Sequence, residues 1–463
     1  MNFSYGNRNL MRIYFRLPKA IRELIAWLYS LKVRNRRFGG VFSAQLEKLK
    51  QNENLTAKER ANEQLSNLKD TLMYAHEFVP YYRNLFNKIG FDPQSIRSLE
   101  EIRSIPPLER DVLRTQNIDL HSQSFRGTTF IHHTSGTTGT ALQFTLSAEA
   151  NQRHYACVWY HYGWAGIKRN DPIATFGAHP LVHPDSTKPP FWLHDHLEND
   201  LFFSLQHISL QTTPLYVQAL IDYKPMMIRG IPSFLNLIAQ HMLETGKTYQ
   251  SKAVFIYSET LLDRQRKTLE LAFNCPVYNF YSNGERTGHI LQCGLGNLHV
   301  MTETCVVEIL RPDGEPVSEG EVGELVITNL INKAMPLIRY RIGDTGVMAG
   351  GSCACGRETP ILKNLTGRIN DSIITNDGRH LRPIGVFANT PNVKEAQFIQ
   401  EKLGSVVVKI VPRQAFGITD EKHIMEELRW ELGNEINIQI DIVDSIMRTE
   451  SGKTQHIISR IHK

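Results

Sequence analysis

Hydrophobic positions divide the chain into stretches of different periodicity. From about residue 40 to residue 115, apolar side chains recur at helical spacing and glycine is scarce, and the pattern ends at the two prolines of 105–108. This spacing predicts a helical N-terminal region. From about 128 to 300, short apolar runs such as 173–176 and 253–256 alternate with helical segments, which predicts strands joined by crossover helices in a mixed sheet.

The last third of the chain changes character twice. Residues 300–365 contain strand-like runs around the turn signal Pro312-Asp313-Gly314, which predicts a small β-rich subdomain. Beyond Gly367-Arg368, a helical pattern at 420–432 and a strictly alternating run at 436–442 predict a compact tail of helix and strand.

These patterns together predict an α/β protein of mixed α+β type. We expect a large N-terminal domain of mixed sheets with flanking helices and a β-rich subdomain, followed by a small mobile α+β domain. The expected divisions are a helical region at 1–115, a core with the β-rich subdomain at 116–366, and the C-terminal domain at 367–463.

Composition narrows the class of protein without naming a function. The chain has 463 residues, 41% hydrophobic and 21% charged, which is ordinary for a globular protein with a large core. Lysine and arginine exceed aspartate and glutamate by only 52 to 47, which does not argue for a nucleic-acid partner. Six cysteines are too few for a disulfide framework. No signal peptide is evident, and no apolar stretch approaches the roughly 20 residues of a membrane span, so we expect a cytoplasmic protein.

The N-terminal segment at 8–37 qualifies that expectation. It carries nine lysines and arginines against one acid, Glu23, interleaved with large apolar side chains. A basic amphipathic helix of this kind can lie on an anionic membrane surface. It can equally pack on the main domain with a solvated basic face. The sequence leaves both interpretations open.

The stretch from Thr134 to Thr140 consists entirely of threonine, serine and glycine, between two apolar runs. Such a loop offers hydroxyls and unhindered backbone N–H groups to one point in space, as a polyphosphate requires. It is not a Walker A loop, because no Gly-Lys-Ser/Thr follows the glycines. A simple hairpin turn is the alternative interpretation.

Four further motifs follow this loop in the chain. Each is compatible with a turn or a helix cap when taken alone. They are Tyr281-Ser282-Asn283-Gly284-Glu285, Tyr340-Arg341-Ile342-Gly343-Asp344, Gly367-Arg368-Ile369-Asn370-Asp371 and Arg448-Thr449-Glu450-Ser451-Gly452-Lys453.

In this order the five motifs resemble the adenylate-forming (ANL) superfamily of acyl-CoA synthetases, adenylation domains and luciferases. Within it the chain is similar to the branch of phenylacetate–CoA ligases and CapK-like proteins. The segments that carry this closer likeness include Val79-Pro80-Tyr81-Tyr82 and Cys353-Ala354-Cys355-Gly356-Arg357. Ser282 and Asn370 depart from the residues that the superfamily usually has at the corresponding positions.

The resemblance implies a reaction of ATP with a carboxylic acid that yields an acyl-adenylate and pyrophosphate. It implies Mg²⁺ on Glu285, adenine on Tyr281, ribose on Asp344, a supporting role for Arg368, and Lys453 at the reacting groups. The residues implied in catalysis are Lys453, Glu285 and Arg368, and those implied in nucleotide binding are Thr134, Ser135, Gly136, Thr137, Thr138, Gly139, Tyr281, Ser282, Asn283 and Asp344.

Two pairs of metal-ligating residues lie apart from these motifs. Cys293 and His299 form one pair, and Cys353 and Cys355 the other, each in a glycine-rich stretch. Three thiolates and one imidazole suit a tetrahedral Zn²⁺ ion, so a structural zinc is one interpretation and four unligated side chains the other.

The expected function is therefore ATP-dependent activation of a carboxylic acid, with acyl transfer to coenzyme A, a carrier-protein thiol or a sugar amine. The CapK-like resemblance implies a place in surface-polysaccharide synthesis, of a capsule or an O-antigen. An aryl-CoA ligase of aromatic acid catabolism is one alternative. A nucleotide-binding assembly factor without ligase activity, in peripheral contact with a membrane, is the other.

Overall fold

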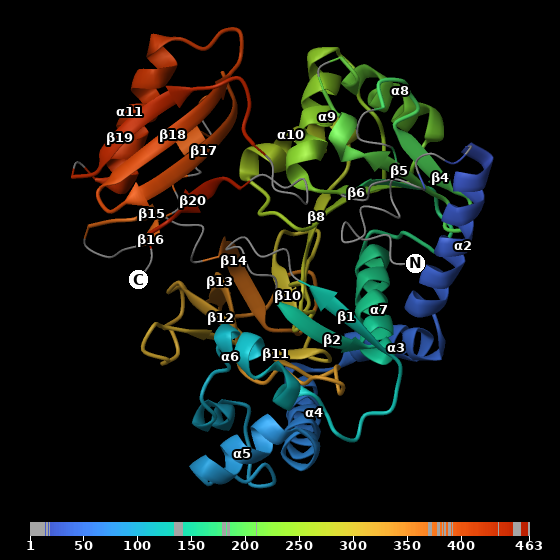
Figure 1. Cartoon of the computed structure of the whole chain (residues 1–463), viewed down its shortest axis with the longest axis vertical. Helices are drawn as coiled ribbons and strands as arrows, with labels where there is room; N and C mark the ends of the chain where they lie inside the picture. The colour runs from blue at the N-terminus through green and yellow to red at the C-terminus, as the bar shows by residue number, and fades with distance from the viewer. Residues whose placement is uncertain are drawn as a thin grey trace.

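The computed structural model describes residues 19–133, 142–177, 186–209, 211–368, 392–433, 435–447 and 455–461, with a few short pieces between them. These residues form a large body built on one long sheet and a smaller C-terminal body, which is orange to red in Figure 1. This arrangement confirms the predicted mixed α+β fold class.

The N-terminal region is helical, as its apolar spacing predicts. Thr56 caps the longest of these helices: its hydroxyl accepts from the Glu59 amide, and the Glu59 carboxylate accepts from the Thr56 amide at 2.9 Å. Pro80 begins the next helix, where a missing N–H costs nothing, and Gly90 ends it at a φ of 67°. The helices are α2 (Lys19–Arg37), α3 (Gly40–Gln51), α4 (Ala57–Phe78), α5 (Pro80–Ile89) and α6 (Arg110–Thr115).

The long sheet has twelve strands in the order β11-β12-β13-β14-β10-β9-β8-β7-β6-β3-β5-β4. Its parallel part runs from β5 through β3, β6 and β7 to β8, and the pairings beyond β8 are antiparallel. The strands are β3 (Ile173–Gly177), β4 (Trp192–Asp195), β5 (Asp200–Ser204), β6 (Met227–Gly230), β7 (Ala253–Ile256), β8 (Val277–Tyr281), β9 (Ile290–Gln292), β10 (Leu298–Val300), β11 (Cys305–Leu310), β12 (Gly323–Asn329), β13 (Tyr340–Ala349) and β14 (Ile361–Arg368).

Helices cover both faces of the parallel part, which explains why its strands read as continuous apolar runs. Every residue of β3 and β7 is buried. One face packs against α8 (Thr213–Tyr223), α9 (Pro232–Glu244) and α10 (Asp263–Phe273), and the other against α7 (Ala148–Trp164). The parallel strands therefore end along one common edge, where sheets of this kind place their ligands.

A separate two-stranded ribbon carries the ends of the threonine- and glycine-rich loop. It consists of β1 (Thr129–His133) and β2 (Gln143–Ser147), paired antiparallel so that His133 is opposite Gln143. Asn332 anchors this ribbon to the large body, because its side chain accepts from the Ser147 amide and donates to the Thr145 carbonyl. The loop residues themselves lie outside the described residues.

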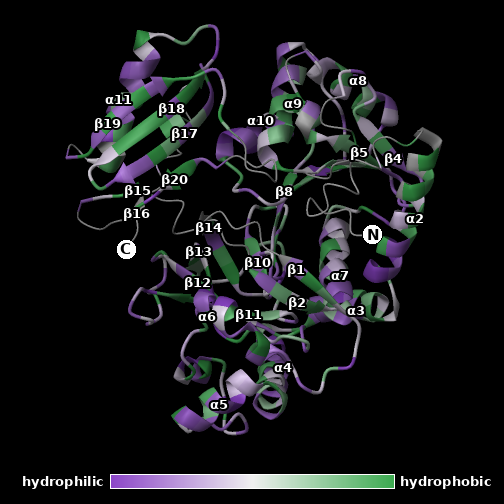
Figure 2. Cartoon of the chain, viewed as in Figure 1, coloured by the Kyte–Doolittle hydropathy of each residue, from purple (hydrophilic) through white to green (hydrophobic). Residues whose placement is uncertain are grey.

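The C-terminal body has its own sheet and its own core. Its four strands lie in the order β19-β18-β17-β20, with α11 (Ile418–Leu432) packed on them. Figure 2 shows hydrophobic residues along β18 and hydrophilic residues along the outer helices. The strands are β17 (Val393–Lys402), β18 (Ser405–Pro412), β19 (Asn437–Ile442) and β20 (Ile457–Ser459), with the short pair β15 (Ile373–Ile374) and β16 (His380–Leu381) beside them.

Polar contacts between described residues join the bodies. Arg413 pairs with Glu244 at 2.8 Å, and Arg264 donates to the Phe387 carbonyl at 3.3 Å. Among the described residues, no helix is both long enough and apolar enough to cross a bilayer.

A buried ion pair ties the N-terminal helical region to the β-rich end of the sheet. Arg339 forms two hydrogen bonds of 2.9 Å with Glu308 and also donates to the carbonyls of Arg103 and Ile105. The Arg339 and Glu308 side chains are only 3% and 8% exposed. Removing the carboxylate would therefore leave a buried charge without its counter-ion.

We predict that Glu308→Ala lowers the free energy of unfolding by about 3–5 kcal/mol, measured by urea denaturation. Glu321→Ala is the control, because Glu321 lies 4.0 Å from Arg311 and both side chains are well exposed. That variant should lose less than about 1 kcal/mol. Equal small losses in the two variants would contradict the role given to Arg339.

Candidate active site and metal centre

The first group of candidate residues meets where the parallel strands end. Tyr281 is the last residue of β8, and its hydroxyl donates a hydrogen bond of 2.6 Å to the Asp344 carboxylate on β13. The two residues are 63 positions apart in the chain. The structure thus brings together an aromatic ring and a carboxylate, the two groups that the sequence assigned to adenine and ribose.

Glu285 lies in the turn that follows Tyr281. Its carboxylate is buried, accepts a hydrogen bond of 2.9 Å from the Tyr340 hydroxyl, and lies 3.9 Å from the Arg110 guanidinium. Burial, and then the charge of Glu285, raise the pKa of the Tyr340 phenol, which therefore stays protonated and donates. A carboxylate offers more lone pairs than these contacts use, so Glu285 retains the capacity to bind a cation.

The turn between Tyr281 and Glu285 is closed by Asn283. Its side chain accepts from the Thr287 amide at 2.8 Å and donates to the Thr287 hydroxyl at 2.7 Å. Asn283 thus shapes the backbone that presents Glu285. The neighbouring Ser282 hydroxyl is buried and has no hydrogen-bond partner among the described residues, so it is available to bind whatever occupies the site.

Arg368 is the residue opposite Asp344 in the pairing of β13 with β14. Only its backbone position is described, and this position places it beside the Tyr281–Asp344 pair. Lys453 and the loop residues Thr134, Ser135, Gly136, Thr137, Thr138 and Gly139 lie outside the described residues. Their assignments stay predictions.

Sequence reasoning missed two residues that hold Glu285. Tyr340 belongs to a motif that was singled out only for its final aspartate, and Arg110 was not singled out at all. Arg110 reaches the site because Leu108, two residues earlier, pairs with the start of β13. The Leu108 amide donates to the Arg339 carbonyl at 2.8 Å, and the Leu108 carbonyl accepts from the Arg341 amide at 3.1 Å. No local pattern in the sequence predicts a bridge between residues so far apart in the chain.

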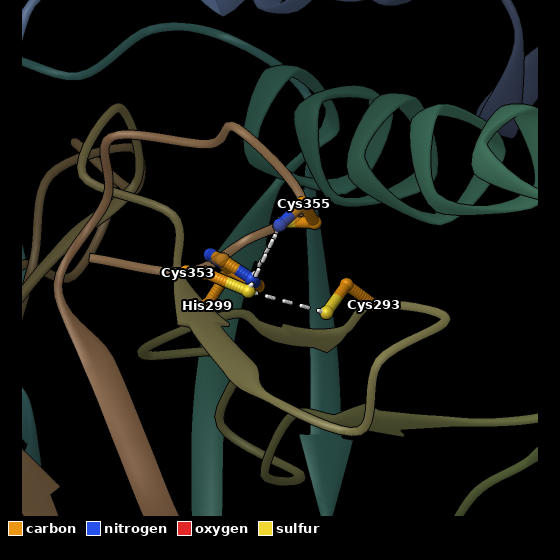
Figure 3. Close-up of side chains that lie close together, drawn as sticks. All are labelled: Cys293, His299, Cys353 and Cys355. Atoms are coloured by element: carbon orange, nitrogen blue, oxygen red, sulfur yellow. Dashed lines mark hydrogen bonds between the residues drawn. The ribbon is translucent and has the colours of Figure 1, made fainter.

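The four candidate metal ligands form a second cluster. They lie on the β9–β10 hairpin and on the segment between β13 and β14. The candidate ligand atoms of Cys293, His299, Cys353 and Cys355 all lie within 4.8 Å of one another. Figure 3 shows the four side chains turned toward one another. The Sγ atoms of Cys293 and Cys353 are 3.8 Å apart, and Cys355 Sγ is 3.3 Å from His299 Nε2.

These distances fit a tetrahedral zinc site. Zn–S bonds of about 2.3 Å at tetrahedral angles place two sulfurs about 3.8 Å apart. The other ring nitrogen, His299 Nδ1, lies 2.8 Å from the Thr359 hydroxyl, and this contact can hold the ring with Nε2 facing the cysteines. No disulfide links these cysteines, which all remain free thiols.

Electrostatics act differently on the ligands of the cluster, and burial raises the pKa of the Cys293 thiol to about 11. Burial, and then Arg357, lower the pKa of His299 to about 4, so its ring is neutral at physiological pH. Burial by itself raises the pKa of the Cys353 thiol, but hydrogen bonds from the Cys355 amide and the Asn297 side chain outweigh it and leave the pKa below its ordinary value. A neutral imidazole and an acidic thiol are both ready to ligate a metal.

Comparisons with known proteins agree on one group. Residues 373–460 match the family model of the CapK C-terminal domain. Protein CapK of Staphylococcus aureus is 25% identical over 405 residues, which cover 84% of this chain and 86% of that protein. A phenylacetate–coenzyme A ligase of Thermus thermophilus is 28% identical over 328 residues, covering 66% and 70% of the two chains.

Among solved structures, the chain is similar to 2-hydroxyisobutyryl-CoA ligase. In the postadenylation state of that ligase the TM-score is 0.69 at 20% identity, with 88% of this chain and 91% of that chain covered. In its thioesterification state the TM-score falls to 0.55 over the same shares of the two chains. The whole-chain arrangement described above is thus more similar to the first of these states.

Proposed function

We propose that the chain is an acid-activating ligase of the adenylate-forming superfamily, in the branch of CapK and the phenylacetate–coenzyme A ligases. In this proposal it uses ATP to convert a carboxylic acid into an acyl-adenylate. The acyl group then passes to coenzyme A, to a carrier thiol or to an amine. The Tyr281–Asp344 pair beside buried Glu285 carries this proposal, since it places an aromatic face, a ribose-type acceptor and a cation ligand at one edge of the sheet.

The chemistry needs positioning more than proton transfer. A carboxylate is ionised at pH 7, so it attacks the α-phosphorus of ATP without a general base while the bond to pyrophosphate breaks. In the second step the acceptor thiol or amine displaces AMP from the acyl carbon and loses its proton. The protein's contribution is to align the reacting groups and stabilise the developing charge.

Each residue of the site has a defined part in this proposal. Tyr281 stacks on adenine and Asp344 accepts hydrogen bonds from the ribose hydroxyls, while Arg368 supports the ribose or phosphate. Glu285 would hold Mg²⁺, which supplies charge neutralisation at the phosphates. Ser282 and Asn283 lie along the nucleotide. The β- and γ-phosphates lie on the loop formed by Thr134, Ser135, Gly136, Thr137, Thr138 and Gly139.

The domain from residue 367 onward serves as a lid that carries Lys453. We propose that it turns about a hinge near Asn370 between the two half-reactions, so that Lys453 serves only the first. The Arg413–Glu244 and Arg264–Phe387 contacts hold the lid in the arrangement described above. Both contacts are polar, which suits an interface that must separate.

Surface-polysaccharide synthesis is the setting that we favour for this reaction, with a sugar amine as one acceptor. Similarity to CapK extends over most of the chain and supports it. Aromatic acid catabolism, with coenzyme A as the acceptor, is the second candidate, supported by the similarity to phenylacetate–coenzyme A ligases. A non-catalytic nucleotide-binding protein is the third, and turnover with any acid would exclude it.

The four-residue cluster of Cys293, His299, Cys353 and Cys355 is proposed to hold a structural Zn²⁺ ion. Its four ligands would close the coordination sphere, so the ion would stabilise the fold and take no part in the reaction. Because the ligands come from two separate segments, the ion would bind the β9–β10 hairpin to the start of β14.

The face of α2 that points to solvent is proposed to contact an anionic membrane surface. Ile21, Leu24, Trp27 and Leu28 are 44–56% exposed along this face, although other residues of the helix pack on the large body. The segment 8–37 is strongly basic, so apolar burial and attraction to anionic headgroups would act together.

We predict that acid-dependent exchange of pyrophosphate into ATP will identify the activated acid in a screen of aryl, fatty and amino acids. Lys453→Ala should lower this exchange about 10²–10³-fold, because it removes one electrostatic contact to the reacting groups. The same variant should still transfer the acyl group from supplied acyl-adenylate. ATP binding without turnover for any acid would reject the ligase, and equal loss of both steps would reject the alternation.

We predict one zinc ion per chain in purified protein, measured by elemental analysis. Cys353→Ser and Cys293→Ser should each lose the metal and lower the melting temperature, because an incomplete ligand set binds zinc poorly. Cys275→Ser serves as the control, since Cys275 is a buried thiol outside the cluster. Zinc well below one per chain, with melting unchanged by a chelator, would refute the site.

We predict that the protein floats with vesicles of phosphatidylcholine and phosphatidylglycerol, and not with phosphatidylcholine alone. The double variant Leu24→Ser/Leu28→Ser should bind these vesicles about tenfold more weakly, because it removes apolar surface from α2. Leu271→Ser is the matched control, since Leu271 is 63% exposed on α10. Equal flotation of the double variant and the parent protein would show that this face of α2 has another role.

A further inference from the structure

Three arginines gather beside the candidate active site without any role in the mechanism above. The Arg37 guanidinium lies 4.5 Å from the ring centre of Tyr155 on α7, and that of Arg286 lies 5.5 Å from it. Arg36 lies 3.6 Å from the ring centre of Phe130 on β1. We call Arg36, Arg37 and Arg286 the arginine cluster.

The arginine cluster has no carboxylate of its own. Within the described part of the chain, none of its three guanidinium groups has a carboxylate oxygen within 4.0 Å. Arg286 donates to the neutral Asn151 side chain, and Asn151 donates to the Arg36 carbonyl at 2.8 Å. All three arginines are partly buried. Partly buried cations without counter-ions are unfavourable, so this surface is suited to an incoming anion.

Nearby arginines show what a structural pairing looks like in this protein. Arg229 is 2.6 Å from the Asp200 carboxylate, and Arg169, which also stacks on an aromatic ring, is 3.0 Å from Glu198. Each of these cations is neutralised by an acid of the chain. The arginine cluster shares the aromatic contacts of these arginines but has no carboxylate within 4.0 Å among the described residues.

Other titratable groups around the cluster do not supply the missing negative charge. His154 and His289 contact each other at 2.8 Å, and burial, followed by Arg286, lowers the pKa of both rings, so they stay neutral. Burial by itself raises the pKa of the Tyr155 phenol, but Arg37 and Arg286 outweigh it and leave that pKa below its ordinary value. The acidic group in contact with Arg37 and Arg286 is thus the Tyr155 phenol.

The position of the cluster along the chain connects it to the candidate site motifs. Arg286 directly follows Glu285, and Phe130 lies on the strand that leads into the loop at 134–140. Figure 1 shows α2, α7 and β1 together on the same side of the large body. Ser282, whose buried hydroxyl has no partner in the described part of the chain, lies in the same turn as Arg286. An acid held with its reacting carboxylate at the nucleotide site can extend from there toward Tyr155.

We propose that the arginine cluster binds a second anionic group, a carboxylate or a phosphate, at the end of the acid substrate opposite the carboxylate that is activated. The substrate class is then a dicarboxylic acid or a phosphate-bearing acid. Guanidinium groups match both anions in planar, two-point geometry. This inference rests on the proposed ligase function. It names the class of acid that the ligase would select, which the reaction alone does not define.

Matched pairs of acids test the proposal in the full-length protein by ATP–pyrophosphate exchange. The probes are valerate against glutarate, hexanoate against adipate, and benzoate against terephthalate, with 4-phosphonobutanoate as the phosphate-like arm. We expect at least one dianionic acid to exceed its monoanionic partner about tenfold or more in kcat/KM. Arg286→Met and Arg37→Met should each reduce that ratio about 10- to 100-fold, the effect of losing one charge-assisted hydrogen bond.

Arg169→Met is the matched control, because Arg169 stacks on Phe38 but is paired with Glu198. It should keep the preference for the dianionic acid. A preference for the monoanionic acid in every pair would overturn the proposal. So would an Arg286→Met variant whose KM for ATP rises as much as its KM for the acid, because the cluster would then serve the nucleotide.

A second measurement separates failure of this inference from failure of the proposed function. If no acid of either kind supports exchange, the ligase proposal fails and the cluster is tested by thermal melting. Stabilisation of the parent protein by adipate or 4-phosphonobutanoate, lost in Arg286→Met and in Arg37→Met, would support an anion site independently of turnover. Absence of any such stabilisation would overturn it.

Discussion

The change of strand direction at β8 is the constraint on which the site depends. β8 pairs in parallel with β7 on one side and antiparallel with β9 on the other. The parallel strands bring their carboxyl ends to one edge, and the antiparallel half returns β13 to the same edge. Tyr281 and Asp344 can therefore form a hydrogen bond although they belong to opposite halves of the sheet. Without this junction the proposed adenine and ribose contacts would have no common location.

Charge is distributed unevenly around that edge. Glu285 is buried and is held by Tyr340 and Arg110, so it provides a negative group at the proposed cation site. Nearby, three arginines contact aromatic rings and have no carboxylate within 4.0 Å among the described residues. A substrate with negative charge at both ends and a nucleotide with its metal ion would complement this pattern. Glu285, the buried acid, and Arg286, one of the three arginines, are neighbours in the chain.

Local patterns in the sequence were sufficient for many of the helices and strands, whereas the site motifs were recognised through their order and their resemblance to a superfamily. Thr56 followed three residues later by Glu59 is typical of a helix start, and the unbroken apolar runs of β3 and β7 are typical of buried strands. Contacts made by distant partners could not be predicted in this way. Arg110 meets Glu285 only because Leu108 bridges to β13, and Arg36 and Arg37 were part of a basic segment that had two open interpretations. The role of an arginine depends on which acid faces it in the fold, and one-dimensional periodicity does not contain that information.

The β9–β10 hairpin is a narrow bridge in an otherwise broad sheet. It joins β8 through two residue pairs, Phe280 with Leu291 and Tyr281 with Ile290, and joins β14 through two more, Leu298 with Leu362 and His299 with Ile361. The cysteine–histidine cluster lies at the second of these junctions. Within the ladder the two halves are thus continuous through these residue pairs, and the Tyr281–Asp344 and Glu285–Tyr340 hydrogen bonds join them a second time at the candidate site. The site is therefore held from two directions, by the backbone ladder of the hairpin and by its own side chains.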